Sequence, residues 1–370
     1  MPTPFDVCLR GAGIVGRTLA LLLARERLRV ALVEQPAPAG GAGSDVRAYA
    51  LNAASKELLE LVRGWPDARH ATPVAAMQVH GDEGGEVNFR AGETGALAWI
   101  GDVAALQQQL SEALRYQPLV TLVSEPPAAA LTVVCEGRAS STRAEFGVQF
   151  EVSHYPQQAI AARLRCEKPH GATARQWFAN GEILAFLPLG GPDGSGPGNS
   201  VALVWSVRKE RAPELLALPA EEFEAQLQAA SHDSLCKLGL VSDRASWPLQ
   251  LARADRWCGP GWALVGDAAH TVHPLSGQGL NLGLADAREL AKVLREREYW
   301  RGVGDMKLLR RYERARQADV LATGAATDGL QRMFDRDAQL PGWVRNWGMR
   351  GFERSGPLKQ WVARQAAGRF

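Results

Sequence analysis

Residues 5–34 read FDVCLRGAGIVGRTLALLLARERLRVALVE, and this stretch predicts the fold of the chain. An apolar run at 5–10 precedes a glycine turn, an apolar helical segment from about Ile14 to Arg27, and a β-rich run at 30–34. A strand, a helix and a second strand in this order form a β-α-β unit, whose strands lie parallel in one sheet. We therefore expect an α/β protein with a Rossmann-like domain.

The glycine turn has the spacing GxGxxG and lies between the first strand and the helix. Gly11 permits a tight turn, Gly13 lets a pyrophosphate approach the backbone, and Gly16 lets the helix pack close to the strand. The free N–H groups at the helix start favour phosphate, and Glu34 can accept hydrogen bonds from a ribose. The motif predicts a dinucleotide site but does not separate FAD from NAD. The expected contacts are Gly11, Gly13, Ile14, Val15, Gly16, Glu34 and Gln35.

A second glycine-rich stretch, VGDAAHTVHPLSGQGLNLGL at 265–284, favours FAD. Asp267 follows a short apolar strand, where its carboxylate can bind the hydroxyls of a ribityl chain. The small residues of 274–279 let a flat ring lie against the backbone. A helix begins near Leu280, and its N–H groups and dipole would stabilise negative charge on the N1–C2=O edge of a flavin. The expected contacts are Gly266, Asp267, Pro274, Gly277, Gln278, Gly279, Leu280 and Asn281.

The middle of the chain carries antiparallel strand signals, which predict a second domain inserted into the first. Alternating patterns occupy 74–90 and 146–166, whereas 47–63 and 213–240 look helical and 126–130 reads as a Pro/Ala linker. The expected division has three parts: an FAD-binding domain at 1–72, 134–150 and 250–325; a β-sheet substrate domain at 73–133 and 151–249; and a C-terminal helical region at 326–370.

Composition argues for a cytoplasmic protein without nucleic-acid partners. The net charge is +2, the five cysteines are scattered, and no apolar run approaches the ~18 residues that span a bilayer. Residues 286–370 carry 18 Lys and Arg against 11 Asp and Glu. This basic end is either a solvated helix face or a surface that docks on the anionic inner face of a membrane, together with Trp300, Trp343, Trp347 and Trp361.

Candidate catalytic residues are few. His270 and His273 have HxxH spacing, but no third ligand stands at metal-site spacing, so we predict no metal. A histidine here could orient substrate or relay protons, or be an ordinary buried side chain. Trp177, Phe178, Phe186 and Trp205 are either substrate-pocket walls or core. The candidates for catalysis are His273, Pro274 and Gln278.

These motifs resemble the group A flavoprotein monooxygenases, and most of all the hydroxylases of ubiquinone biosynthesis. The similarity covers nearly the whole chain, and GD…HPLSGQGLNLG is its most specific part. It implies the fold of para-hydroxybenzoate hydroxylase, with an FAD-binding domain, an inserted β-sheet domain and C-terminal helices. The matching segments are GAGIVGRTLALLLARERLRVALVEQ at 11–35, DVRAYALNAAS at 45–55, the block at 155–191, GDAAHTVHPLSGQGLNLGLADARELAKVL at 266–294, YERARQADV…ATDGLQRMF at 312–334, and PLKQWVARQAAGRF at 357–370.

The resemblance also implies roles for single residues. It places Arg47 near the pyrophosphate or the flavin entrance, Asp267 on the ribityl chain, and 277–279 along the isoalloxazine ring. This chain departs from the family by having Glu136-Gly137 where Asp-Gly is usual, with Ser140 and Arg143 at matching places. It also has Gly-Asp-Val-Ala-Ala before Leu106, where a basic or amide residue is common and where Gln107 could substitute.

The resemblance implies hydroxylation of an aromatic ring through a C4a-hydroperoxyflavin, with FAD as cofactor and NAD(P)H and molecular oxygen as co-substrates. A polyprenyl phenol or related precursor would be the substrate, and a peripheral membrane position, a quinone-biosynthesis complex and a homo-oligomer are the expected associations. Two alternatives stay open. One is another flavin enzyme of the same fold, such as a prenyl reductase or a hydroxylase of small aromatic acids. The other is a non-catalytic scaffold of a biosynthetic complex.

Overall fold

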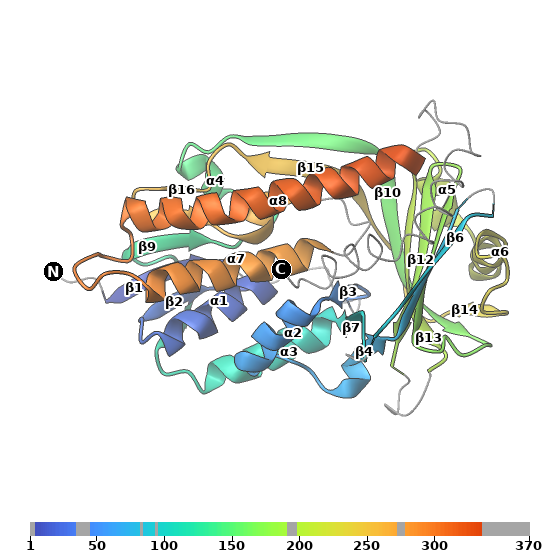
Figure 1. Cartoon of the computed structure of the whole chain (residues 1–370), viewed down its shortest axis with the longest axis horizontal. Coiled ribbons are helices and arrows are strands. Elements are labelled where there is room, and N and C mark those ends of the chain that lie inside the picture. Colours follow the sequence, from blue (N-terminus) through green and yellow to red (C-terminus); the bar gives the residue numbers. More distant parts are fainter. Residues whose placement is uncertain are drawn as a thin grey trace.

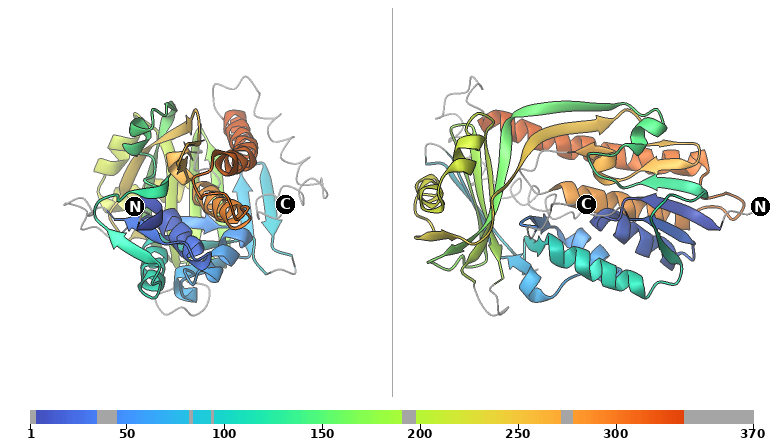
Figure 2. Two further views of the ribbon diagram at one scale, coloured as in Figure 1. Left: turned by 90° about the vertical axis from the view of Figure 1, so that its left-hand side faces the viewer. Right: turned by 180° about the vertical axis from the view of Figure 1, so that it is seen from behind.

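The computed structural model describes residues 4–34, 45–81, 84–92, 95–190, 198–271 and 278–334, with side chains as far as Leu321. Helices and a parallel sheet form one end of the molecule, and a large antiparallel sheet forms the other (Figures 1 and 2). The N-terminal β-α-β unit lies at the end away from the antiparallel sheet.

The parallel sheet is built around β1 (Phe5–Arg10), which pairs in parallel with β2 (Val30–Val33) and β9 (Ala129–Val134). All four residues of β2 are buried, which explains why its sequence is apolar throughout rather than alternating. β8 (Val120–Val123), β17 (Trp262–Leu264) and β16 (Cys258–Gly259) complete the order β16-β17-β9-β1-β2-β8 within the described residues. The β-α-β prediction is therefore confirmed.

The expected division of the chain is wrong for residues 103–133. We placed 73–133 in the β-sheet substrate domain, yet β8 and β9 pair in parallel with β2 and β1. Helix α3 (Val103–Arg115) packs against α1 (Ile14–Arg25) beside the same sheet. The prolines at 126–127 suggested a linker, but β9 begins directly after them and buries Leu131 and Val133 completely. The remaining boundaries of the division stay predictions.

Helices α1, α7 (Gln278–Arg295) and α8 (Met306–Phe334) lie side by side beside the parallel sheet, as Figure 1 shows. Their contacts are dominated by fully buried leucines, among them Leu19 and Leu23 of α1. Burial of such side chains contributes roughly 1.5–3 kcal/mol each to folding. This apolar contact fixes the two glycine-rich helix starts, at 14 and 278, within one half of the molecule.

The helix expected over 47–63 begins later than predicted. Its first part is strand β3 (Ala48–Leu51), and helix α2 (Ala53–Leu61) starts only after Asn52, whose side chain accepts a hydrogen bond from the N–H of Ser55. β3 pairs with β7 (Ala98–Asp102), which also pairs with β4 (Ala71–Val74). Pairing between segments distant in sequence thus overrides the local helical preference of DVRAYAL.

The large sheet, antiparallel apart from one parallel pair of strands, is centred on the 17-residue strand β10 (Phe150–Cys166). Its order among the described residues is β18-β15-β10-β13-β12-β11-β5-β6, and β14 pairs with β10 beside that path. The strands of this path are β18 (His270–Thr271), β15 (Ala245–Ala254), β13 (Ser200–Arg208), β12 (Glu182–Leu189), β11 (Thr173–Ala179), β5 (Ala76–His80) and β6 (Glu86–Arg90), and the strand beside it is β14 (Leu238–Leu240). The residues expected to be helical at 213–240 form α5 (Ala212–Ala217) and α6 (Ala220–Ala230), followed by β14.

The two faces of this sheet carry side chains of different size. On the face packed against α5 and α6, large side chains such as Trp205 and Phe186 form a core with Phe223. The opposite face packs against β3, β4 and β7. Several of its positions are small and apolar, beside larger or polar side chains such as Val204, Phe178 and Arg163; the small ones are Ala159, Ala161, Ala174, Ala185 and Ala202. Since neighbouring residues of a strand alternate between faces, this difference follows directly from the sequence pattern of 157–207.

A buried histidine in the connection between β10 and β11 is expected to make stability depend on pH. Nε2 of His170 lies 2.9 Å from the carbonyl oxygen of Leu189, and the N–H of Ala172 donates to Nδ1. Burial lowers the pKa of His170, because the charged imidazolium loses its hydration there; the charge of Arg175 acts in the same direction, and the Leu189 carbonyl acts against it.

We therefore expect stability to fall as the pH drops below about 6.5, the pKa of an unfolded histidine, by up to about 1.4 kcal/mol per pH unit until the folded pKa is passed. Urea denaturation at pH 8 and pH 5.5 measures this loss. The loss should be smaller in His170→Asn, and an equal loss in both proteins would contradict the assignment.

Candidate active site

The GxGxxG turn is packed too tightly for side chains at its first and last glycine. Gly11 has φ +111°, and a Cβ there would lie 2.6 Å from the carbonyl oxygen of Cys135. A Cβ on Gly16 would lie 2.0 Å from the carbonyl oxygen of Gly11. Both positions therefore require glycine on steric grounds, so that β1, β9 and the start of α1 can approach one another.

Gly13, the middle glycine, is open instead. It is exposed, it is the N-cap of α1, and a Cβ there would meet no described atom within 4 Å. No side chain caps the helix, so the N–H groups of the first turn, which includes Ile14 and Val15, have no side-chain acceptor. An open space bordered by helix N–H groups suits a phosphate, so this part of the chain fits a dinucleotide.

Glu34 follows β2 and is held by a basic side chain. Nη2 of Arg17 lies 2.5 Å from Oε1 of Glu34. Arg17 also donates to the carbonyl oxygen of Gln107 at 3.0 Å and to the hydroxyl of Ser111. Glu34 and Gln107, two of the predicted contacts, thus lie on opposite sides of one guanidinium, although Gln107 contributes its backbone rather than its amide. Gln35 lies outside the described residues.

The turn before Asp267 lies directly against the first glycine motif. Gly266 has φ +67°, and a Cβ built on it would approach Val15 and Gly283 to 3.6–3.7 Å. A Cβ on Gly283 of α7 would lie 2.9 Å from Val15. The short helix η2 (Gly266–Ala268), α1 and α7 therefore meet at one point, as a site shared by both motifs requires.

Asp267 is half-buried and accepts no side-chain hydrogen bond within the described part of the chain. Burial raises its pKa, although nearby His270, Arg138 and Arg47 act in the opposite direction. Burial raises the pKa of nearby Tyr49, and the charge of Asp267 contributes to that rise. The carboxylate is thus available to the hydroxyl groups of a ligand.

The start of α7 is only partly described. Gln278, Gly279 and Leu280 are partly exposed at its first turn, and a Cβ on Gly279 would meet nothing within 4 Å. His273, Pro274 and Gly277 lie outside the described residues, so their predicted roles in catalysis and flavin binding stay predictions.

The side chain of Asn281 is engaged within the protein. Its amide nitrogen donates to the carbonyl oxygen of Ala50 at 2.8 Å, and its oxygen accepts from the N–H of Asn52 and the hydroxyl of Ser55. These contacts attach α7 to β3 and to the cap of α2. They give Asn281 a positioning role, whereas its predicted contact with the cofactor stays a prediction.

Glu136 is held by the loop that follows it. Its carboxylate accepts from the hydroxyls of Ser140 and Thr142, both at 2.7 Å, and lies 3.7 Å from Arg10. Buried Arg143 donates to the carbonyl oxygen of Ala268 at 3.1 Å, and its guanidinium stacks on the ring of Phe150. The Glu136 loop is therefore attached to the residue next to Asp267.

A buried charge cluster lies behind the Asp267 turn. The carboxylate of Asp286, fully buried on α7, accepts from the N–H of Gly266 and from Nε of Arg316 and lies 2.6 Å from Nε2 of His270. The ring of His270 stacks on Trp257. His270 is thus a buried core residue in hydrogen-bond contact with Asp286, and no group of three or more potential ligands in the described ranges is arranged to hold a metal.

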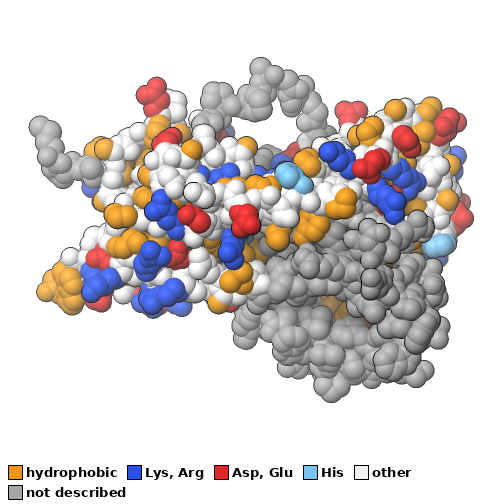
Figure 3. All heavy atoms as spheres, turned by 90° about the horizontal axis from the view of Figure 1, so that it is seen from above, with side chains coloured by type: hydrophobic (Ala, Val, Ile, Leu, Met, Phe, Trp, Pro, Cys, Tyr) orange, Lys and Arg blue, Asp and Glu red, His pale blue; other side chains and the backbone are white. Residues whose placement is uncertain are grey.

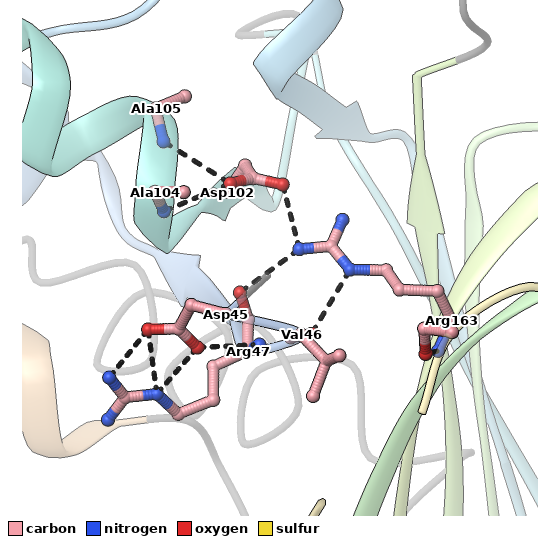
Figure 4. Close-up of polar contacts among 8 residues, drawn as sticks. Asp45, Val46, Arg47, Asp102, Ala104, Ala105 and Arg163 are labelled. Atoms are coloured by element: carbon pink, nitrogen blue, oxygen red, sulfur yellow. Dashed lines mark hydrogen bonds and ion pairs between the residues drawn. The ribbon is translucent and has the colours of Figure 1, made fainter. Parts of the chain in front are cut away.

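The segment that carries Arg47 bridges the two halves of the molecule. Arg47 forms an ion pair with Asp45 at 2.6 Å, and this partner raises its pKa. Arg163 of β10 donates to the carbonyl oxygens of Val46 and Arg47 and pairs with Asp102 (Figure 4). An aspartate directly before a helical segment is a typical N-cap, so this role of Asp102 could be predicted from the sequence. No neighbouring residue in the sequence indicates the long-range contacts of Arg163.

The aromatic residues proposed as pocket walls are mostly core. Trp177, Phe186 and Trp205 belong to the cluster packed against α6, which lies on the far side of the sheet from the glycine turns. Phe178 is buried on the opposite face. Because side chains alternate between the two faces of a strand, Trp177, Phe186 and Trp205 are core residues and not walls of a pocket beside the glycine turns.

Comparisons with known proteins agree with this geometry. Residues 125–325 match the FAD binding domain family. The chain is 32% identical to the ubiquinone hydroxylase UbiL of Rhodospirillum rubrum, over 98% of this chain and 89% of that protein. It is 31% identical to the 3-demethoxyubiquinol 3-hydroxylase of Escherichia coli, over 99% of each. The chain belongs to the FAD-binding monooxygenases.

Solved structures show the same fold. PqsL of Pseudomonas aeruginosa superposes with a TM-score of 0.74 at 22% identity, covering 93% of this chain and 99% of that one. The p-nitrophenol 4-monooxygenase PnpA of Pseudomonas putida also gives 0.74, at 16% identity and over 99% and 98% of the two chains. The predicted fold, a parallel FAD-binding sheet with an antiparallel sheet, is confirmed. The monooxygenase shows no helix in its described ranges with the length and apolarity needed to cross a bilayer.

Proposed function

We propose that this monooxygenase hydroxylates the aromatic ring of a polyprenyl phenol or a related precursor in ubiquinone biosynthesis. The observation that carries the proposal is the near full-length similarity to two enzymes named for ubiquinone chemistry, at 32% and 31% identity. That similarity extends over both sheets, and so over the residues that would contact FAD and those that would contact substrate.

The antiparallel sheet supports an apolar, flat substrate. The face turned to β3, β4 and β7 carries alanines at 159, 161, 185 and 202, an apolar surface of the kind that a ring and an isoprenoid chain would contact. Arg163, a basic side chain on this face, is already paired with Asp102 at 2.7 Å. A carboxylate-bearing substrate would have to compete for that guanidinium, and this disfavours a hydroxylase of small aromatic acids.

Bound FAD would supply the redox chemistry that activates oxygen, with NAD(P)H as a transient co-substrate. The residues of the chain would bind and orient it. Helix α1 would hold the pyrophosphate at Gly13, Asp267 would accept hydrogen bonds from the ribityl hydroxyls, and the first turn of α7 would stabilise negative charge at the ring. The apolar sheet face would keep water from the reacting ring.

Turnover with isotopic oxygen tests this function. Purified protein loaded with FAD is mixed with NADH or NADPH, a short-chain polyprenyl phenol and ¹⁸O₂, and the products are analysed by mass spectrometry. We expect one labelled hydroxyl group on the ring and faster oxidation of the nicotinamide when the phenol is present. Reduction of the prenyl chain would indicate a reductase, and labelled hydroxybenzoate without labelled polyprenyl product would indicate a small-acid hydroxylase. FAD that neither nicotinamide reduces would favour a scaffold.

We also propose that the basic C-terminal end docks the protein on an anionic membrane, where a polyprenyl substrate would reside. Basic and acidic side chains are interspersed on the face shown in Figure 3, which shows no purely basic patch. The proposal is supported instead by the excess of Lys and Arg over Asp and Glu in residues 286–370. Trp300 is 67% exposed. Trp343, Trp347 and Trp361 lie outside the described residues. Flotation with vesicles of anionic lipid should carry the protein upward, and flotation equal to that with neutral vesicles would refute the proposal. A quinone-biosynthesis complex and a homo-oligomer stay predictions.

A further inference from the structure

Arg163 reaches from the antiparallel sheet to the flavin-binding half of the molecule. Its Nε donates to the carbonyl oxygen of Val46 at 3.1 Å, and its Nη2 donates to that of Arg47 at 3.2 Å. Its side chain is 19% exposed, so water screens these bonds only in part. Figure 4 shows the guanidinium lying between the strand that carries it and the segment 45–47.

Asp102 connects the same guanidinium to helix α3. Its Oδ2 lies 2.7 Å from Nη2 of Arg163, while its Oδ1 accepts from the N–H groups of Ala104 and Ala105. One carboxylate thus caps the helix and pairs with an arginine from the other sheet. Ala48 of β3 lies opposite Asp102 in the pairing register, so the contact is made next to the segment that carries Arg47.

The contact with the backbone of Arg47 matters because of where its side chain lies. Arg47 directly precedes β3, which Asn281 at the start of α7 holds through the carbonyl oxygen of Ala50 at 2.8 Å, so the segment lies beside the helix start expected at the flavin. In agreement with this place, the charge of Arg47 opposes the rise in pKa that burial causes at Asp267. Its guanidinium is also paired with Asp45, two residues earlier in the same segment. A shift of the backbone at 46–47 would therefore move the Arg47 guanidinium and the Asp45 carboxylate relative to FAD.

We propose that Arg163, together with Asp102, is a positioning residue that holds the backbone at 46–47 so that Arg47 can bind FAD. The proposal rests on a contact between Arg47 and FAD, which the same experiment measures. Arg163 acts through the carbonyl oxygens and touches neither cofactor nor substrate. It links the sheet that would receive substrate to the segment that would hold the cofactor.

A double-mutant cycle tests the proposal without using turnover. Apoprotein is titrated with FAD, and the quenching of flavin fluorescence gives the dissociation constant for four proteins: the natural chain, Arg163→Gln, Arg47→Gln and the double variant. We expect each single variant to weaken FAD binding roughly tenfold, because Arg47→Gln removes a charge-assisted hydrogen bond to the cofactor and Arg163→Gln displaces the guanidinium that makes it. The double variant should bind FAD like Arg47→Gln alone, because Arg163 acts only through Arg47.

Three further variants separate positioning from general stability. Arg244 also donates to two carbonyl oxygens, those of Leu215 and Leu218, but on the α5 and α6 side of the sheet, so Arg244→Gln should leave FAD affinity unchanged. Asp102→Asn keeps the oxygen that caps α3 but loses the charge that pairs with Arg163, so its FAD affinity should fall as far as that of Arg163→Gln. This variant tests the proposal even if Arg163→Gln does not fold. Arg163→Lys keeps the charge but not the planar fork, and should restore the affinity only in part.

The outcomes are distinct. Additive losses in the double variant, unchanged affinity in Arg163→Gln or Arg47→Gln, or an equal loss in Arg244→Gln would each overturn the proposal. None of these outcomes affects the proposed hydroxylation, because FAD binding is measured here without substrate, oxygen or nicotinamide.

Discussion

Asp286→Asn is expected to lower the free energy of unfolding by about 3–5 kcal/mol, the usual cost of removing one partner of a buried ion pair. The carboxylate is fully buried, and it neutralises Arg316 while it accepts hydrogen bonds from the N–H of Gly266 and from Nε of Arg316; Nε2 of His270 lies 2.6 Å from it. An asparagine has the same shape but no charge, so the guanidinium of Arg316 would be left in the core without its main counter-charge.

Asp319→Asn is the matched control. Asp319 pairs with the same arginine at 2.5 Å, but its side chain is 42% exposed, so its loss should cost no more than about 1 kcal/mol. Urea denaturation of both apoproteins measures the difference. Because Asp286 also holds the backbone of Gly266, the first variant should lose FAD more readily as well. Equal stabilities of the two variants would show that the buried cluster contributes little.

Gly13→Glu is expected to weaken FAD binding by roughly 1000-fold while the apoprotein keeps most of its stability. The position is open on the protein side, so a side chain there meets no described atom within 4 Å. A carboxylate about 4 Å from a phosphate would cost about 4 kcal/mol at the effective dielectric constant of a protein surface, which corresponds to about three powers of ten in affinity. Fluorescence titration of the apoprotein with FAD gives the change.

Two companion variants make the result specific. Gly302→Glu places the same charge on another exposed glycine with nothing within 4 Å, and its FAD affinity should equal that of the natural chain. Gly13→Ala adds bulk without charge and should show an intermediate loss. If Gly13→Glu bound FAD normally, the pyrophosphate would have to lie elsewhere, and the reading of the first motif would be wrong.

The sequence by itself determined the strands, the helix and the turns whose signals lie within a few neighbouring residues. The two strands and the helix of 5–33 are fixed by continuous apolar runs and by three glycines, two of which have no room for a Cβ. The same holds for the turn at Gly266, whose φ of +67° favours glycine. The apolar runs and the glycine spacing are visible within a few residues of each other, so sequence alone could predict the β-α-β unit and a dinucleotide site, although the nearest atoms that crowd Gly11 belong to distant Cys135.

Other features depend on partners far away in the chain. The segment 48–51 has a helical pattern but becomes a strand because it pairs with β7, about 50 residues later (Ala48 opposite Asp102). β9 follows two prolines but joins the parallel sheet through β1. In both cases, hydrogen bonds to a distant strand outweigh the local preference, and no window of sequence contains that information.

The candidate site divides in the same way. The sequence by itself determined which residues could bind phosphate, ribose and the flavin ring, because each needs only a glycine, a helix start or a carboxylate after a strand. Only the tertiary structure decided what holds them: Arg316 and His270 around Asp286, Arg17 between Glu34 and α3, and Arg163 behind Arg47. An arginine side chain is long enough to reach acceptors on several neighbouring strands and helices. Its partners therefore depend on how these elements pack and not on spacing along the chain.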